Sequence, residues 1–222
     1  MKIIKEVISE LISVFSGKTI DVIIPPVLFL VLIKLFSLEI ALIGSLLLSI
    51  IFLFTRIKNK DNLVYAIGGL IGVIFASTMT YISDNASNFF LPDIIGTFTL
   101  IVVTSISIIL KRPIAAYVSH ITRSWDINWF KRDDVRPAYM EVSIFWLVFF
   151  ISRLSVEVYL YFSSTVDELV FANVILGLPV TIFVLTVSYV YGIWRLHNLK
   201  GPGIDEFLDN KEPPYRGQRK GF

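Results

Sequence analysis

The sequence predicts an all-α, polytopic membrane protein, and its composition and hydropathy support this fold class. Of 222 residues, 55% are hydrophobic and only 17% are charged, whereas soluble domains are roughly 45–50% apolar and about 25% charged. The mean hydropathy is +0.74. The apolar residues form continuous runs, not the alternating pattern of a membrane β-strand. A soluble fold of this composition would expose a large apolar surface and aggregate.

The composition also argues against several classes of function. The chain has no cysteine, so a disulfide framework, a thiol nucleophile and a thiolate metal site are excluded. Its two histidines have no carboxylate at ligand spacing, and no zinc-protease helix, nucleophile elbow or kinase signature occurs. The net charge of +2 is too small to indicate nucleic-acid binding. We therefore expect no enzymatic activity, no cofactor, no metal and no nucleic-acid partner.

Six apolar runs predict six transmembrane helices, since a helix needs roughly 17–25 apolar residues to cross a bilayer. The runs cover residues 19–36, 40–54, 63–82, 91–110, 138–162 and 169–194. The first two are short and closely spaced, so a re-entrant hairpin is the alternative there. Prolines interrupt the first, fourth and sixth runs.

The basic residues predict the orientation, because Lys and Arg gather in cytoplasmic loops. They concentrate at the N-terminus, after the second run, in an insertion at 111–137 and after Trp194, whereas residues 83–88 and 163–168 contain none. With six spans, both termini lie in the cytoplasm. We expect a multi-pass protein of the plasma (inner) membrane.

The predicted transmembrane domain covers residues 17–196. One segment precedes it, one lies in its insertion and one follows it. Residues 1–16 have an apolar and a polar stripe, which predicts an amphipathic helix on the membrane surface. A second interfacial helix is expected to begin at Pro113, with an apolar stripe on one side. That stripe consists of Ile114, Tyr117, Val118, Ile121 and Trp125. Residues 197–222 are rich in proline, glycine and charge, which predicts a mobile cytoplasmic tail.

The two halves of the chain show a weak internal similarity. The third run begins Leu-Val-Tyr-Ala and the sixth begins Leu-Val-Phe-Ala, and prolines lie near the start of the first and fourth. Three spans per half would give two inverted three-helix repeats, an arrangement that many transporters use. Chance matches among apolar residues are the alternative.

Ionisable residues inside spans are candidate functional groups, because burying them in a bilayer is costly. Arg153 and Glu157 share a helix face four residues apart. With Asp93 and Lys34, they form a candidate intramembrane polar cluster open to the outer side. The alternative is a structural ion pair that fixes helix packing. Gly68, Gly72 and Ala76 form a small-residue stripe that we expect to serve packing within the chain, with dimerisation as the alternative.

Several motifs recur together in an order that resembles a known family. They are DVIIP at 21–25, LVYAIGGLIGV at 63–73, NFFLP at 88–92, KRP at 111–113 and RPAY at 136–139, with Trp146 and Arg153. The sequence resembles the integral-membrane family called domain of unknown function 3159 over roughly residues 16–196. It is more distantly similar to the intracellular septation protein A group. The resemblance implies six spans without an established catalytic activity. Asp93 and Glu157 depart from the family pattern.

Two functions from different classes fit these features. The first is a non-enzymatic scaffold or assembly factor of the cell envelope, whose cytoplasmic side contacts anionic lipid headgroups and protein partners or a second copy of the chain. The second is a small transporter or channel with an outward-facing polar cavity, favoured by the repeat and the polar cluster.

Overall fold

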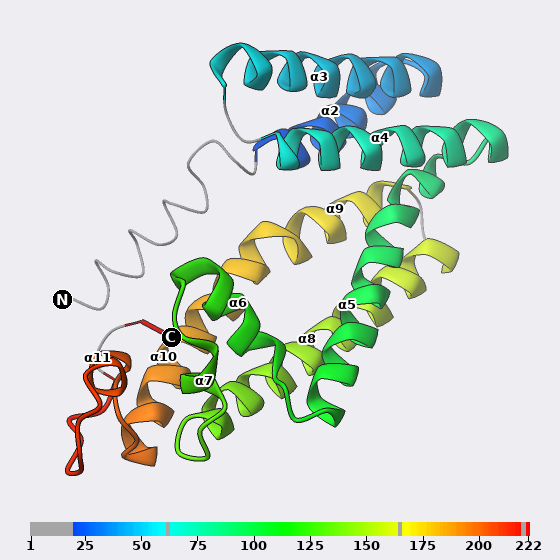
Figure 1. The fold of residues 1–222 in the computed structure, drawn as a ribbon. Helices are drawn as coiled ribbons and strands as arrows, with labels where there is room; N and C mark the ends of the chain where they lie inside the picture. Colours follow the sequence, from blue (N-terminus) through cyan, green and yellow to red (C-terminus); the bar gives the residue numbers. More distant parts are fainter. Residues whose placement is uncertain (1–19, 61–62, 164–165, 219–220) are drawn as a thin grey trace. The chain divides into compact units, whose positions relative to one another are not determined.

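The computed structural model describes residues 20–60, 63–163, 166–218 and 221–222, and these residues are helical without strands. The chain divides into two compact units (Figure 1). Unit 1 contains the described residues up to Ile95 together with Tyr159–Phe171, and unit 2 contains Gly96–Val158 and Ala172–Phe222. The helices α5, α8 and α9 each contribute to both units.

Unit 1 is built on three helices that contact one another, α2 (Ile20–Leu35), α3 (Leu38–Asn59) and α4 (Val64–Ser83). A short 3-10 helix, η1 (Ala86–Phe90), follows α4 and packs against it. The core centres on Phe29, whose ring is stacked on that of Phe89 at 3.7 Å between centroids. Ser37 begins α3 by accepting a hydrogen bond from the Ile40 backbone N–H, which satisfies one of the unpaired donors of a helix start.

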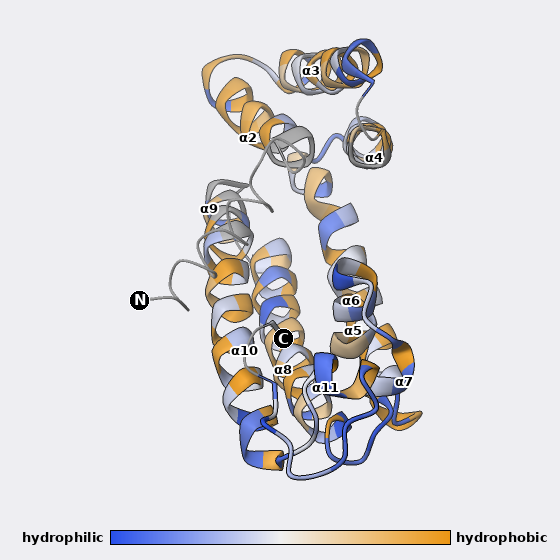
Figure 2. Ribbon diagram, turned by 60° about the vertical axis from the view of Figure 1, so that its left-hand side comes forward, coloured by the Kyte–Doolittle hydropathy of each residue, from blue (hydrophilic) through white to orange (hydrophobic). Residues whose placement is uncertain are grey.

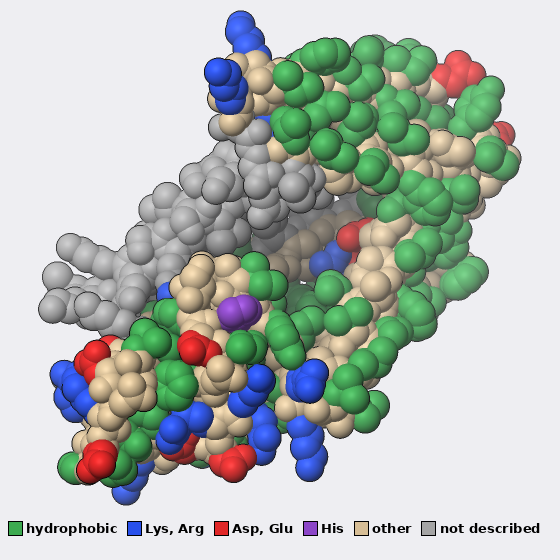
Figure 3. Space-filling view, viewed as in Figure 1, with side chains coloured by type: hydrophobic (Ala, Val, Ile, Leu, Met, Phe, Trp, Pro, Cys, Tyr) green, Lys and Arg blue, Asp and Glu red, His purple; other side chains and the backbone are tan. Residues whose placement is uncertain are grey.

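Unit 2 contains two long helices, α8 (Arg136–Ser163) and α10 (Leu178–Leu199), and most of α5 (Leu91–Ile109). Shorter helices gather at one end of this unit, namely α6 (Ile114–Arg123), α7 (Ile127–Phe130) and α11 (Ile204–Leu208). Polar residues concentrate at this end, whereas the long helices are mainly apolar (Figure 2). Charged side chains cover the same end (Figure 3). We call it the charged end of unit 2.

Five of the described helices are long and apolar enough to cross a bilayer: Leu38–Asn59, Ala66–Ser83, Ala86–Ile109, Arg136–Ser163 and Pro179–Leu199. Many of their apolar side chains are exposed, including Leu47, Ile74 and Val148. Exposed apolar surface of this extent is favourable in lipid but not in water. The expectation of a multi-pass membrane protein is therefore supported.

The predicted first span, at 19–36, differs from the others. Its described helix α2 has 16 residues, or about 24 Å at 1.5 Å per residue, which is shorter than a hydrocarbon core of about 30 Å. The helix continues through Pro25 and Pro26, so the expected interruption there is not observed. The sixth span and the inverted repeats stay predictions.

The predicted last span, at 169–194, is wrong in its boundaries. The structure divides it into α9 (Val166–Leu176) and α10, with Gly177 in a non-helical conformation between them. Pro179 explains the break, because proline inside a helix removes a hydrogen bond and clashes with the preceding turn. In the first turn of α10 the missing N–H has no cost.

The helix predicted from Pro113 is confirmed as α6, with Pro113 as its N-cap, and its position at the membrane surface stays a prediction. Ala115, Ala116 and Ser119 face the protein, and the apolar stripe is exposed, with Ile121 76% exposed. Trp125 was expected in this stripe but does not belong to it. It packs against Trp129 and Phe130. The N-terminal amphipathic helix predicted at 1–16 lies outside the described residues.

The small-residue stripe of α4 is only partly used for packing within the described part of the chain. Ala76 is buried in the core of unit 1. A methyl group added to Gly68 or Gly72 would meet no described atom within 4 Å. Close packing within the chain is therefore observed for Ala76 and not for the two glycines.

Candidate functional site

The ion pair predicted between Arg153 and Glu157 is present on α8 in unit 2. Arg153 Nε donates to Glu157 Oε1 at 2.6 Å, and the Glu157 side chain is 0% exposed. The two residues lie one helical turn apart, which places their side chains on the same face. A charged arginine in a span costs at least ~2.5–3.5 kcal/mol on insertion scales. Its contact with Glu157 offsets part of this cost.

The other two members of the predicted polar cluster belong to unit 1. Lys34 lies in the last turn of α2 and Asp93 in the first turn of α5, and both side chains are exposed. Of the four predicted residues, Arg153 and Glu157 lie in the same unit and form an ion pair. An outward-facing cavity that joins all four residues stays a prediction.

A second ion pair, which the sequence analysis missed, joins α8 to α10 near the charged end of unit 2. Arg195 donates to both carboxylate oxygens of Glu141, with Nε–Oε2 at 2.8 Å and Nη2–Oε1 at 2.9 Å. The Tyr191 hydroxyl donates to Glu141 Oε2 at 2.7 Å. A bidentate arginine–carboxylate contact fixes direction as well as distance. Nothing in the local sequence indicates this pair, because its members are 54 residues apart.

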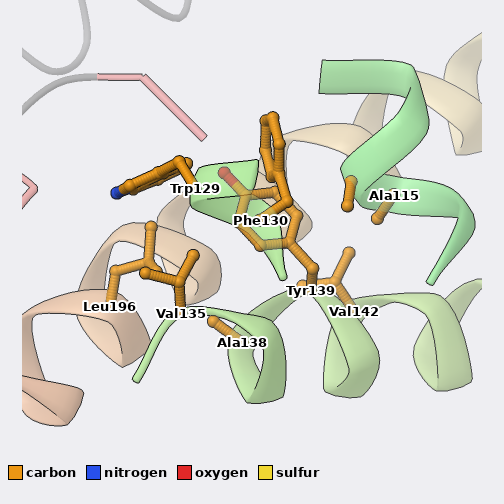
Figure 4. Close-up of a cluster of buried hydrophobic side chains, with 9 residues drawn as sticks. Ala115, Trp129, Phe130, Val135, Ala138, Tyr139, Val142 and Leu196 are labelled. Carbon is orange, nitrogen blue, oxygen red and sulfur yellow. The ribbon is translucent and has the colours of Figure 1, made fainter. Parts of the chain in front are cut away.

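An aromatic cluster forms the core of the charged end. Trp129, Phe130 and Tyr139 pack edge to face around Val135 and Leu196, as the close-up shows (Figure 4). Trp129 and Tyr139 are fully buried. Large aromatic side chains contribute much apolar area and prefer these edge-to-face contacts. The short helix α7 therefore docks onto the start of α8.

The C-terminal segment packs onto this aromatic cluster, which corrects the prediction of a mobile tail at 197–222. The ring of Phe222 is stacked on Tyr139 at 4.2 Å between centroids. Trp129 Nε1 donates to the Pro202 carbonyl at 2.9 Å, and Arg123 Nε donates to the Phe222 carbonyl at 3.2 Å. A methyl group at Gly192 would lie 2.2 Å from the Phe222 ring, so glycine is required there for this contact.

A buried carboxylate organises the C-terminal segment from within. Glu206 is 3% exposed. Its oxygens accept hydrogen bonds from the backbone N–H groups of Gly203, Arg216 and Gly217 at 3.0, 2.9 and 3.1 Å. These donors, first that of Arg216, lower the pKa of Glu206 to about 2, because they stabilise the charged form. We call the described residues from Gly201 to Phe222 the C-terminal cap.

Three other polar residues of the charged end have local partners. Arg132 donates to Asp134 at 2.8 and 2.7 Å, and this contact raises the pKa of Arg132. Arg136 donates to Asp133 at 2.7 Å. Each of the two adjacent aspartates is therefore neutralised by a neighbouring arginine. His120 Nδ1 lies 2.5 Å from the Trp125 carbonyl oxygen. Among the described residues, no group of three histidine, aspartate or glutamate side chains could hold a metal ion.

Replacing Glu157 alone should destabilise the protein more than removing both charges of the pair. Glu157→Leu removes the carboxylate that Arg153 contacts, and breaking a buried pair in this way typically costs ~3–5 kcal/mol. The double variant, Arg153→Met with Glu157→Leu, removes both charges and should cost less. Thermal unfolding in detergent measures both variants, with Glu39→Leu as the control because Glu39 is an exposed carboxylate. Equal stability of wild type and Glu157→Leu would show that the pair does not stabilise the fold.

Glu206 should keep the C-terminal cap docked until the pH becomes strongly acidic. Its folded pKa of about 2 lies below the usual value of about 4.3. Its contribution is therefore complete above about pH 4.3 and is lost as the pH falls towards 2. Tryptophan fluorescence against pH measures the loss, since undocking exposes Trp129.

At neutral pH, Glu206→Gln should open the cap, because the amide places an NH₂ group among backbone donors. Trypsin cleavage at Lys211 and Arg216 should then accelerate by about tenfold or more, the equivalent of ~1.4 kcal/mol or more. Glu212→Gln is the matched control, since Glu212 is exposed in the same segment. Equal cleavage rates for the two variants would contradict the role of Glu206.

Comparison with known proteins agrees with the resemblance in the sequence. The profile described as "Protein of unknown function (DUF3159)" matches residues 16–196. The match includes the Arg153–Glu157 and Glu141–Arg195 ion pairs and the aromatic cluster. It ends before the C-terminal cap. No curated protein and no solved structure matches the chain. The more distant similarity to the intracellular septation protein A group stays a prediction. The chain belongs to the DUF3159 family of proteins of unknown function.

Proposed function

We propose that this chain is a non-enzymatic scaffold or assembly factor of the cell envelope, held in the plasma (inner) membrane. The observation that carries the proposal is the folded C-terminal cap on the charged end of unit 2. The cap is held from inside by Glu206 and Phe222, which hold its backbone in place. A rigid surface of this kind loses little conformational entropy when a protein partner binds.

The outward surface of the cap has the character of a partner-binding surface. Leu208 on α11 is 61% exposed. Lys211 and Arg216, three and eight residues further along the chain, are also exposed. An apolar anchor among polar groups is a common arrangement at protein interfaces. In this proposal the spans place the cap at the membrane, and Leu208 contacts a cytoplasmic protein.

The proposal includes six spans with both termini in the cytoplasm. The basic residues after α3, between α5 and α8, and after α10 support this orientation. In it, α2 crosses the bilayer as the remaining span, and local thinning of the bilayer accommodates its short described length.

Single-cysteine labelling tests this topology, and the chain without native cysteine is a clean background. In intact cells, an impermeant thiol reagent should label a cysteine at Ser163 and should not label cysteines at Lys2 or Asn59. Each should become reactive when the membrane is permeabilised. Labelling at Lys2 alone would show that α2 does not cross. Labelling at Asn59 in intact cells would show that the orientation is the reverse of the one proposed.

The second candidate function is a small transporter or channel. Two observations favour it, the Arg153–Glu157 pair inside a candidate span and the helix break at Gly177. Transporters often place polar groups and interrupted helices near the centre of the membrane. In this alternative, the two halves of the chain form inverted repeats around an outward-facing cavity.

Complementation with two variants separates the two functions. In a strain that lacks the gene and grows poorly, Leu208→Asp changes the cap surface, and Arg153→Met with Glu157→Leu removes the intramembrane charges. The scaffold proposal predicts that Leu208→Asp fails to restore growth while the double variant restores it. The reverse result would indicate transport. Restoration by both would contradict a partner site at Leu208. Membrane levels of each variant are the control.

A further inference from the structure

A pocket of about 340 Å³ lies at the charged end of unit 2, among the end of α5, the start of α6, α7 and the start of α8. Its volume is within the range of about 300–1,000 Å³ that small-molecule sites occupy. We infer that this pocket binds the phosphate headgroup of an anionic membrane lipid. The inference rests on the membrane location of the chain and does not depend on the scaffold role.

Four cationic side chains line the pocket: Lys111, Arg112, Lys131 and Arg136. Among the described residues that line it, none is acidic. Lys111 and Arg112 are exposed, and their side chains form no ion pair with any described residue. One acidic residue outside the lining, Asp133, contacts Arg136 and is itself 91% exposed. The pocket therefore carries an excess of positive charge, which a phosphate group would neutralise.

The backbone at the end of α5 places these cations together. Lys111 has a positive φ of 54°, and its N–H and that of Arg112 donate to the Ile108 and Ser107 carbonyls. This hydrogen bonding ends the helix in the manner of a C-cap, and Pro113 then begins the approach to α6. The motifs at 111–113 and 136–139, singled out in the sequence, thus meet at one pocket.

The rest of the pocket wall is apolar, which favours a lipid over a free anion. Phe130 is buried in this wall, and Tyr117 lines the pocket from α6. Tyr117 also belongs to the exposed apolar stripe of α6, together with Val118 and Ile121. A headgroup in the pocket would therefore leave its acyl chains beside an apolar surface. The α6 backbone is already satisfied, since the Ile114 and Ala115 N–H groups donate to Ser107 and Ser143. Side chains must supply the phosphate contacts.

Native mass spectrometry of the purified full-length chain in detergent tests the inference, with phosphatidylglycerol as the probe. Phosphatidylcholine with the same acyl chains is the zwitterionic comparison. The test variant is Lys111→Gln with Arg112→Gln. The matched control is Lys58→Gln with Lys60→Gln, which removes the same charge from exposed positions at the end of α3. Tyr117→Ser tests the apolar wall.

We expect one phosphatidylglycerol molecule to bind several-fold more tightly than phosphatidylcholine. The test variant should weaken its binding by about tenfold or more, since each basic residue near an anionic lipid contributes ~1 kcal/mol. The control should change it less than about twofold, and Tyr117→Ser should weaken it too. Equal weakening by test and control variants would indicate diffuse surface charge and overturn the inference. Displacement of the lipid by inorganic phosphate, with Tyr117→Ser having no effect, would instead identify a free-phosphate site.

Discussion

The charged end of unit 2 depends on the burial of two aromatic side chains, Trp129 and Tyr139. Trp129 lies on α7 and Tyr139 near the start of α8, and they contact the C-terminal segment through the Pro202 carbonyl and the Phe222 ring. Removing these rings from water stabilises the docked arrangement. Because α6, α7, α10 and the C-terminal cap all meet at this cluster, its loss would separate the elements of the charged end.

The long helices have the opposite arrangement to the charged end, with apolar side chains outside and polar ones inside. The long helices expose apolar side chains and bury small or polar ones, such as Ser45, Thr80 and Ser143. Several hydroxyls inside the helices donate to carbonyls one turn earlier, as Ser49 does to Ser45, which satisfies these donors within their own helix. The buried pair Arg153–Glu157 follows the same rule for charges. Polarity therefore increases towards the charged end of unit 2.

The sequence predicted the helices whose limits are set by local chemistry. The runs at 63–82, 91–110 and 138–162 agree with α4, α5 and α8 within a few residues, because continuous hydropathy and capping are local signals. The i, i+4 spacing likewise predicted the Arg153–Glu157 pair. The division at Gly177 was harder to predict, since Pro179 lies within an otherwise continuous apolar run.

The C-terminal cap could not be predicted from composition, because its stability comes from contacts between distant residues. Proline, glycine and charge are typical of disordered chains, yet here a carboxylate buried among backbone donors and a terminal aromatic ring hold the segment in place. Two signals were present in the sequence: a glutamate three residues after Gly203, as in a capping box, and an aromatic residue at position 222. Glu141–Arg195 and the pocket at 111–136 also depend on tertiary contacts.

Amide hydrogen exchange of the full-length chain in lipid nanodiscs tests the central claim, that the C-terminal segment is a docked cap. The backbone N–H groups of Gly203, Arg216 and Gly217 donate to Glu206, so they should exchange far more slowly than the exposed residues of the same segment. Slow exchange at these three positions, together with Gly221 bonded to the Tyr189 hydroxyl, is the result expected of a docked cap. Exchange of all four at the rate of an unstructured peptide would contradict it.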